Sequence, residues 1–155
     1  MSYRLRGLEP ALFEKFFDLD EPALAERSMR WMRVDKAVGF PCRISLVDAP
    51  VGEDVLLLTF THQNGRSPYR ASGPIFVRRG QHAAAEFVDE LPPYLTLRPL
   101  SIRAYDAADE MIDADVVDGS RAEALIERYL ANEATQYLHV HYARRGCFAC
   151  RIERA

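Results

Sequence analysis

The residues best suited to chemistry lie near the C-terminus, in the segment TQYLHVHYARRGCFACRIER over residues 135–154. The segment alternates in polarity, breaks at Arg144-Arg145-Gly146, and alternates again, which is typical of a β-hairpin. Two histidines, two cysteines and several arginines lie within it. If the hairpin brings these side chains to one face, that face could support nucleophilic, acid–base or anion-binding chemistry.

The loop length decides which side chains share a face, because successive residues of a strand point to opposite sides. A two-residue loop at Arg145-Gly146 would mix the two histidines with Phe148 and Ile152, which packs poorly. A three-residue loop, Arg144-Arg145-Gly146, pairs Ala143 with Cys147 and gives Gly146 the left-handed conformation that glycine adopts without steric cost. We therefore predict the three-residue loop.

The three-residue loop sorts the hairpin into two faces. The apolar face contains Leu138, Val140, Tyr142, Phe148, Cys150 and Ile152. The other face contains His139, His141, Ala143, Cys147, Ala149 and Arg151. Residues two apart on a strand are roughly 6–7 Å apart, so both histidines could contact one ligand.

The first functional hypothesis is a small-molecule enzyme or binding protein with a His/Cys/Arg pocket on this face. Cys147 would be the nucleophile, and His141 or His139 would be the base that generates its thiolate. The simpler alternative is the polar side of a half-covered sheet, because histidines on strands are often only solvated or hydrogen-bonded.

An anionic small molecule is the predicted ligand, because arginine offers a planar fork to carboxylate and phosphate groups. Candidate binding residues are Arg70, Ser72 and Gly73 in the loop SPYRASGP, with His62 at the end of a predicted central strand. Arg43 and Arg151 could complete the site. The spacing matches no phosphate-binding loop or dinucleotide motif, and no cofactor is identified.

Two other hypotheses remain open. His139 and His141, joined by His62 and possibly Cys147, could form a zinc or iron centre, although two ligands alone do not make a motif. The protein could instead be an interaction domain without catalysis, with homodimerisation through an edge strand. A redox dithiol is not predicted, because Cys147 and Cys150 point to opposite faces of a strand and no helix N-terminus lies beside them.

The composition indicates an ordinary globular protein. The 155 residues are 48% hydrophobic and 28% charged, which is enough for one domain, residues 1–155, with a proper core. The net charge of −3 argues against nucleic-acid binding, and no apolar run reaches the length of a membrane span. The absence of an apolar signal region and an odd number of cysteines, three, predict a cytoplasmic protein.

The remaining elements must position these residues. Helical segments are predicted from Pro10, from Asp20 as N-cap, over residues 81–93, and from a capping box at Ser120 and Glu123 to Asn132. Strands are predicted over residues 42–47, 54–62, 75–78, 101–105 and 111–117. Short connections favour antiparallel pairing. We therefore expect an α+β fold: a mainly antiparallel curved sheet or partly closed barrel, with N-terminal helices and one helix before the C-terminal hairpin.

Four segments together resemble a known family. They are GFPCRISL (39–46), HQNGRSPYRASGPIFVR (62–78), RAYDAADEMIDADVVDG (103–119) and HVHYARRGCFACR (139–151). The sequence is similar to the uncharacterised bacterial family called domain of unknown function 1203, over nearly the whole chain. The resemblance implies a bacterial, single-domain protein and supplies no reaction, cofactor or catalytic residue.

Overall fold

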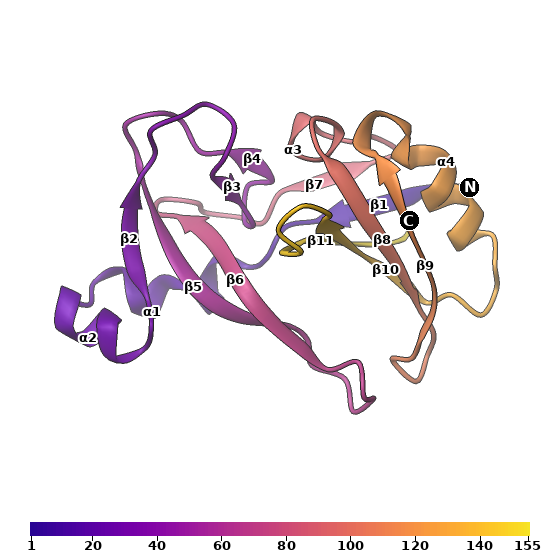
Figure 1. The fold of residues 1–155 in the computed structure, drawn as a ribbon, viewed down its shortest axis with the longest axis horizontal. Helices are drawn as coiled ribbons and strands as arrows, with labels where there is room; N and C mark the ends of the chain where they lie inside the picture. The colour runs from indigo at the N-terminus through magenta and orange to yellow at the C-terminus, as the bar shows by residue number, and fades with distance from the viewer.

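Two β-sheets dominate the computed structural model, which covers residues 1–155 (Figure 1). Sheet A is antiparallel throughout, in the order β7 (Glu86–Val88), β1 (Tyr3–Arg6), β11 (Phe148–Arg154), β10 (Tyr137–Tyr142), β8 (Pro99–Tyr105) and β9 (Met111–Asp118). Sheet B has the order β2 (Arg30–Arg33), β5 (Asp54–Gln63), β6 (Ala71–Arg78), β3 (Pro41–Cys42) and β4 (Val47–Asp48). The predicted α+β class and mainly antiparallel pairing are confirmed, but there are two sheets and no closed barrel.

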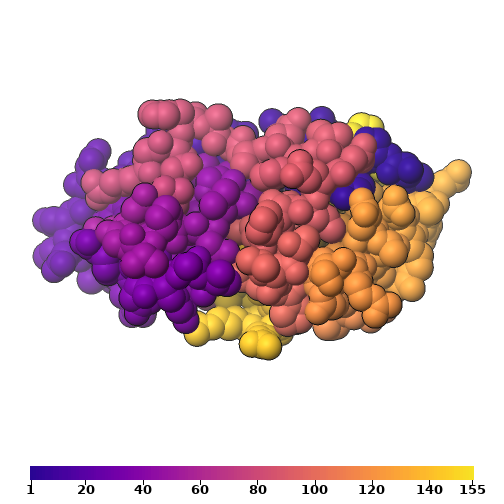
Figure 2. Space-filling model, turned by 90° about the horizontal axis from the view of Figure 1, so that it is seen from above, coloured from indigo at the N-terminus to yellow at the C-terminus, as the bar shows by residue number.

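Sheet B is formed by one continuous stretch of chain between β1 and β7, two neighbouring strands of sheet A. The short helices η1 (Pro10–Leu12), α1 (Glu14–Phe17) and α2 (Glu21–Glu26) lead into it, and Asp20 caps α2 through a bond from the Ala23 N–H, as predicted. In the space-filling view, the purple residues that follow β1 lie on the left and the orange later-chain residues on the right, with the indigo N-terminal residues beside the orange ones (Figure 2). Sheet B contacts the β10–β11 hairpin through β5 and β6, where Phe60 and His62 pack against Phe148.

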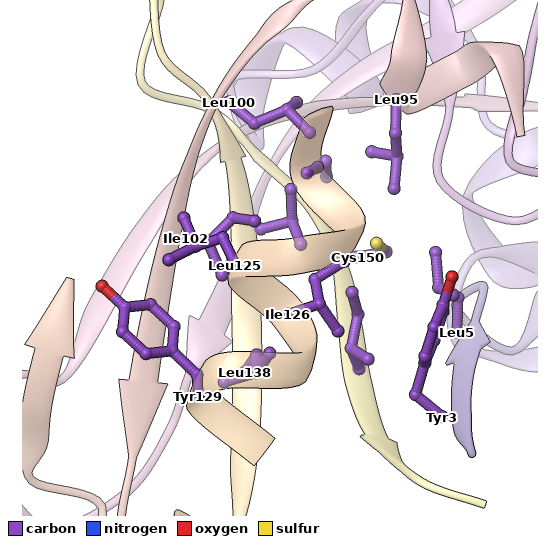
Figure 3. Close-up of a cluster of buried hydrophobic side chains, with 14 of the residues drawn as sticks. Tyr3, Leu5, Leu95, Leu100, Ile102, Leu125, Ile126, Tyr129, Leu138 and Cys150 are labelled. Atoms are coloured by element: carbon purple, nitrogen blue, oxygen red, sulfur yellow. The ribbon is translucent and has the colours of Figure 1, made fainter. Parts of the chain in front are cut away.

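The larger hydrophobic core lies between sheet A and α4 (Ala122–Leu130) (Figure 3). As predicted, the helix buries a single apolar face: Ala122, Leu125, Ile126, Tyr129 and Leu130. The predicted capping box is not formed. Instead Asp118 accepts from the Ser120 N–H and starts the 3-10 turn η2 (Gly119–Arg121), while Glu123 accepts a hydrogen bond from Tyr3 Oη.

Two further predictions of secondary structure are wrong. Residues 81–93 contain the edge strand β7 rather than a helix, because its backbone pairs with β1; the short helix α3 (Pro93–Thr96) follows. The predicted strand over residues 42–47 breaks after Cys42, where the chain turns through Leu46 at φ 52°. This turn lets β3 pair with both β6 and β4, and it orients Arg43 toward the hairpin.

The register of the C-terminal hairpin agrees with the prediction over most of its length. Leu138 pairs with Ile152, His139 with Arg151 and Val140 with Cys150. Nearer the loop the prediction is wrong: the Tyr142 N–H, not Ala143, bonds to the Cys147 carbonyl, so the predicted pairing of Ala143 with Cys147 across a three-residue loop is not formed. His141 pairs with Phe148, and Ala149 becomes the extra residue of a β-bulge. The bulge places the small Ala149 in the core of sheet A and turns the Phe148 ring to the histidine face. Gly146 has the predicted left-handed conformation, with φ 78°.

No helix is long and apolar enough to cross a membrane; α4, the longest, has 9 residues. Its C-terminal end is held by Arg154 of β11, whose guanidinium donates to the carbonyls of Leu130, Asn132 and Thr135 at 2.6–3.1 Å. Charged donors at this end of a helix satisfy carbonyls that have no partner within the helix.

We predict that Arg154→Ala lowers the free energy of unfolding by about 1–3 kcal/mol, because several charged hydrogen bonds to partly buried carbonyls are lost. Arg154→Lys should recover only part of the loss, since lysine lacks the planar fork. Urea unfolding monitored by circular dichroism measures both. Arg33→Ala, which removes an exposed ion pair with Asp54 and an exposed hydrogen bond to the Gly52 carbonyl, is the control; an equal loss in the two alanine variants would contradict the capping role.

Candidate functional site

Three histidines meet where the two sheets contact each other. His62 comes from β5 of sheet B, and His139 and His141 come from β10 of sheet A. The ring centroid of His62 is 4.8 Å from that of His141 and 6.1 Å from that of His139. Phe148 completes the group: its ring stacks on His62 at 5.3 Å and meets His139 edge-on at 5.1 Å. We call these four side chains the histidine cluster.

The hydrogen bonds of His141 fix its tautomer. Its Nδ1 lies 2.8 Å from the Gly146 carbonyl oxygen, which can only accept, so Nδ1 carries the proton. Its Nε2 lies 3.4 Å from Nη1 of Arg103, which can only donate. Both ring nitrogens of His141 are therefore occupied, and the imidazole is neutral.

Burial keeps the histidine cluster uncharged. His139 and His141 are 2% and 0% exposed, and Nδ1 of both His62 and His139 has no hydrogen-bond partner. Burial lowers the pKa of His139 to about 2, and the positive charges of Arg151 and Arg103 act in the same direction. Burial also lowers the pKa of His141 to about 3, and it lowers the pKa of His62, with Arg103 adding to the effect. A charged imidazole is unfavourable at all three positions.

Tyr137 packs its ring against His139 of the histidine cluster, at 5.1 Å between ring centroids, and its hydroxyl joins the ends of two β-hairpins by hydrogen bonds. Tyr137 donates to Asp109 Oδ1 at 2.6 Å and accepts from Gln63 Nε2 at 2.8 Å. The Arg151 guanidinium lies 3.8 Å over the Tyr137 ring. These contacts join the β5–β6 hairpin to the β8–β9 turn, and they place Arg151 on an aromatic surface.

The arrangement of these side chains does not support a metal centre. No group of three or more His, Cys, Asp or Glu side chains is placed to hold a metal ion. At His141 both nitrogens are already used, and the cationic Arg103 stands where a metal ion would approach Nε2. The geometry therefore does not favour a metal site at His62, His139 and His141.

Cys147 lies in a different place, in a pocket of about 320 Å³ between the two sheets. The hairpin loop, the segment before β3 and the segment between α3 and β8 form its walls. Five cationic side chains line it, and no carboxylate does: Lys36, Arg43, Arg98, Arg144 and Arg145. We call this feature the arginine pocket. No histidine lines it, and the only hydrogen-bond partner of the Cys147 Sγ is the Arg145 carbonyl, at 3.9 Å.

Arg43 is the most deeply placed cation of the arginine pocket, at 2% exposure. Its Nε donates to the Phe148 carbonyl at 2.8 Å and its Nη1 to the Pro41 carbonyl at 2.5 Å. Its guanidinium also lies 5.3 Å from the centre of the Tyr142 ring. Two of the five N–H donors of a guanidinium are thereby used, and the others have no acceptor within the protein.

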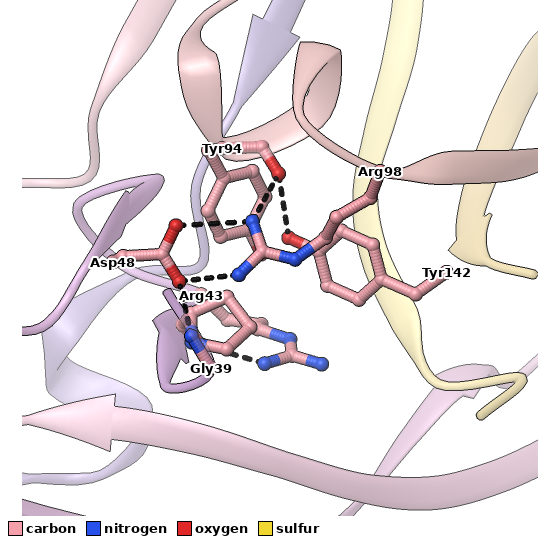
Figure 4. A network of polar contacts seen from close by, with 7 residues as sticks. Gly39, Arg43, Asp48, Tyr94, Arg98 and Tyr142 are labelled. Carbon is pink, nitrogen blue, oxygen red and sulfur yellow. Dashed lines mark hydrogen bonds and ion pairs between the residues drawn. The ribbon is translucent and has the colours of Figure 1, made fainter. Parts of the chain in front are cut away.

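Arg98 is held by a network of polar contacts next to Tyr142 (Figure 4). It forms an ion pair with Asp48 and donates to the Tyr94 carbonyl at 2.9 Å, while its guanidinium lies 4.9 Å from the Tyr142 ring centre. The Tyr142 hydroxyl donates to the same Tyr94 carbonyl at 3.2 Å. Asp48 thus neutralises one of the five cations and fixes its position.

The other predicted binding residues lie outside the arginine pocket. Arg70 is exposed and donates to the Asn64 carbonyl at 2.7 Å, which closes the β5–β6 loop. Ser72 shares a hydrogen bond with Thr61 at 2.8 Å, and Gly73 sits opposite Phe60 in the β5–β6 ladder. Of the predicted set, the structure brings His62, His139 and His141 together in one place, and Arg43 and Cys147 together in another.

Sequence reasoning missed several residues of the arginine pocket. Arg144 and Arg145 form a basic pair in the sequence, but the hairpin pattern assigns them only to the loop. Lys36, Arg98 and Tyr142 reach the pocket from three separate segments, and no local motif connects them. Arg103, which donates to Nε2 of His141, lies on β8, and no local motif relates it to the histidines.

The buried histidines predict a loss of stability in acid. Each has a folded-state pKa below the ordinary value near 6.5, so its contribution is complete above that pH and is lost as the pH falls toward the folded-state value. His139 and His141 should each add up to about 1.4 kcal/mol per pH unit to the slope of the free energy of unfolding between about pH 6 and 4.

His139→Phe should reduce that slope by up to about 1.4 kcal/mol per pH unit, which corresponds to one bound proton, because the unfolded variant no longer gains a proton at this position. The Nδ1 of His139 has no partner, so phenylalanine loses no hydrogen bond there. Urea titrations at a series of pH values measure the slope. The exposed His82→Phe is the control and should leave it unchanged; equal slopes for His139→Phe and the parent protein would contradict the assignment.

Comparison with known proteins gives a family and no activity. No curated protein matches the chain, and no solved structure matches it. One family model does match, over residues 39–154, which include the arginine pocket cations Arg43, Arg98, Arg144 and Arg145 and the three histidines. Because the match covers far more than half of the sequence, the chain belongs to the family described as "Protein of unknown function (DUF1203)".

Proposed function

We propose that this protein binds an anionic small molecule in the arginine pocket. The observation that carries the proposal is the charge of the lining: five cations and no carboxylate, in a protein whose net charge is −3. Asp48 forms an ion pair with Arg98 and with no other cation of the arginine pocket. The remaining positive charge has no counter-ion within the protein, and an anionic ligand would supply it.

The hydrogen-bonding capacity of the arginine pocket fits the same class of ligand. Arg43 is rigidly held by two carbonyls and by Tyr142, yet it keeps free N–H donors. A guanidinium fixed in this way can bind a carboxylate or phosphate group without a further loss of side-chain freedom. Arg144 and Arg145 are exposed at the rim, where they would attract the anion from solution.

The apolar part of the lining favours an organic anion over a bare ion. Val38, Phe76 and Leu97 contribute hydrophobic surface to the arginine pocket. A volume of about 320 Å³ lies at the lower end of the range of typical ligand pockets. The expected ligand is therefore a compact molecule with at least one carboxylate or phosphate group and an apolar portion.

Binding is proposed rather than catalysis by the Cys147–histidine pair. A general base must lie within hydrogen-bond reach of the thiol, and no hydrogen bond joins Cys147 to a histidine. The Nδ1–H of His141 donates to the Gly146 carbonyl instead. Cys147 and Arg43 belong to the proposed binding site, whereas the histidine cluster packs the two sheets together.

The interaction hypothesis has less support at the edge of sheet A formed by β9. Two backbone N–H groups of this exposed strand, those of Ala114 and Val116, are taken by the preceding side chains Asp113 and Asp115, at 2.8 Å each. Donors occupied in this way cannot pair with an incoming strand, and the added negative charge discourages pairing further. A bacterial cytoplasmic setting, which would suit three free cysteines, stays a prediction.

The proposal is tested by isothermal titration calorimetry with citrate, succinate, inorganic phosphate and pyrophosphate as probes. We expect saturable binding of at least one of them that weakens as salt is added, because part of the attraction is electrostatic. The double variant Arg144→Gln/Arg145→Gln should bind about tenfold more weakly, a change of about 1.4 kcal/mol. Both side chains are exposed, so the fold should be unaffected.

Arg66→Gln combined with Arg70→Gln is the matched control. It removes the same charge from exposed positions in the β5–β6 loop, outside the arginine pocket. The control should bind like the parent protein. Equal weakening in both double variants would show only a general charge effect, and the absence of binding by all four probes would refute the proposal.

A further inference from the structure

Cys147 is the only cysteine of the chain that solvent can reach. Cys42 and Cys150 are 0% and 1% exposed, whereas Cys147 is partly exposed, and all three are free thiols. Cys150 lies in the core of sheet A and Cys42 in the core of sheet B. A thiol-specific reagent that does not unfold the protein should therefore react with only one thiol, that of Cys147.

The thiol of Cys147 faces a site that is built for anions. It lines the arginine pocket together with the buried Arg43, which keeps N–H donors that have no acceptor within the protein. The preceding residue, Gly146, holds the loop in a left-handed turn, and the flanking Arg144 and Arg145 stand at the rim. An anionic molecule held by these cations would lie beside the sulfur.

We propose that Cys147 undergoes thiol–disulfide exchange with anionic low-molecular-weight disulfides, so that an anionic thiol becomes attached in the arginine pocket. The inference rests on the proposed function, because the same cations select the reagent. It assigns to Cys147 a reversible modification and to the arginine pocket a substrate class, namely disulfides that carry carboxylates.

The exchange is balanced without a further oxidant. The Cys147 thiol releases its proton to solvent, and the resulting thiolate attacks one sulfur of the disulfide. A new S–S bond forms between Cys147 and that half of the reagent, while the original S–S bond breaks. The other half leaves as a thiolate and takes a proton from solvent, so the number of disulfides and thiols is unchanged. A reducing thiol reverses the step by the same chemistry.

The two buried cysteines do not compete for the adduct. The Cys42 sulfur accepts a hydrogen bond from the Arg78 backbone N–H at 3.4 Å. Burial raises the pKa of the Cys150 thiol to about 12, so very little thiolate is present there at neutral pH. The mixed disulfide formed at Cys147 has no accessible second thiol in the chain to resolve it.

The experiment compares two disulfides of opposite charge. Oxidised glutathione is net negative and cystamine is net positive at neutral pH. Rates of adduct formation on the reduced, folded protein are followed by intact mass spectrometry, and the site is identified by peptide mapping. Each rate is divided by the rate with a neutral reference thiol, N-acetylcysteine amide, which removes the intrinsic difference between the reagents.

We expect a single adduct, on Cys147, and a normalised rate at least about tenfold higher for oxidised glutathione than for cystamine at low salt. The preference should largely vanish in about 1 M salt, where the screening length is about 3 Å. It should fall roughly threefold or more in Arg144→Gln/Arg145→Gln and should be retained in Arg66→Gln/Arg70→Gln. Normalised rates that do not differ, or adducts on Cys42 or Cys150, would overturn the inference.

The failure of this inference is distinguishable from failure of the proposed function. Cys147→Ser cannot form the adduct but keeps every cation of the arginine pocket, so the calorimetric probes should still bind to it. Binding of those probes together with no charge preference in exchange would overturn the inference and leave anion binding in place. A preference that persists in Arg144→Gln/Arg145→Gln at high salt would overturn the role assigned to the cations.

Discussion

The position of Phe148 is the constraint on which the arrangement of both sheets depends. Its carbonyl accepts the Nε–H of Arg43 from sheet B, and its ring packs against His62 of sheet B and against His139 and His141 of sheet A. Without the bulge at Ala149, alternation would turn this ring into the core beneath α4. One extra residue in β11 therefore supplies an aromatic contact and a hydrogen bond between the two sheets.

The same bulge separates two kinds of chemistry that the sequence places side by side. On the histidine side, buried aromatic rings stay neutral, and their nitrogens are either satisfied, as in His141, or unpartnered. On the loop side, Cys147 opens toward five cations. The histidines act as polar aromatic packing residues, and the reactive thiol is left with arginines rather than with a base.

The sequence is sufficient to predict features that depend on residues close together in the chain. The buried face of α4, the Asp20 cap and the pairing of Val140 with Cys150 all follow from periodicity or spacing. The sequence-based prediction is wrong where contacts between distant segments determine the structure. The pairing of β7 with β1 overrode a helical pattern, and the bulge depends on a partner ring in another sheet. The arginine pocket draws on distant segments, which no motif relates.

The arginine pocket and the histidine cluster are linked through Arg43. Burial is the main reason that the pKa of His141 is low, and the positive charges of Arg103 and Arg43 lower it further. An anion bound beside Arg43 would reduce the effect of the Arg43 charge on His141 and so make protonation of His141 less unfavourable. Because such coupling is reciprocal, protonation of His141 would also strengthen binding of the anion. Burial opposes that protonation, so the histidines stay neutral at physiological pH. The positive field of the arginine pocket therefore comes from permanent charges, and anion binding there should depend on salt far more than on pH.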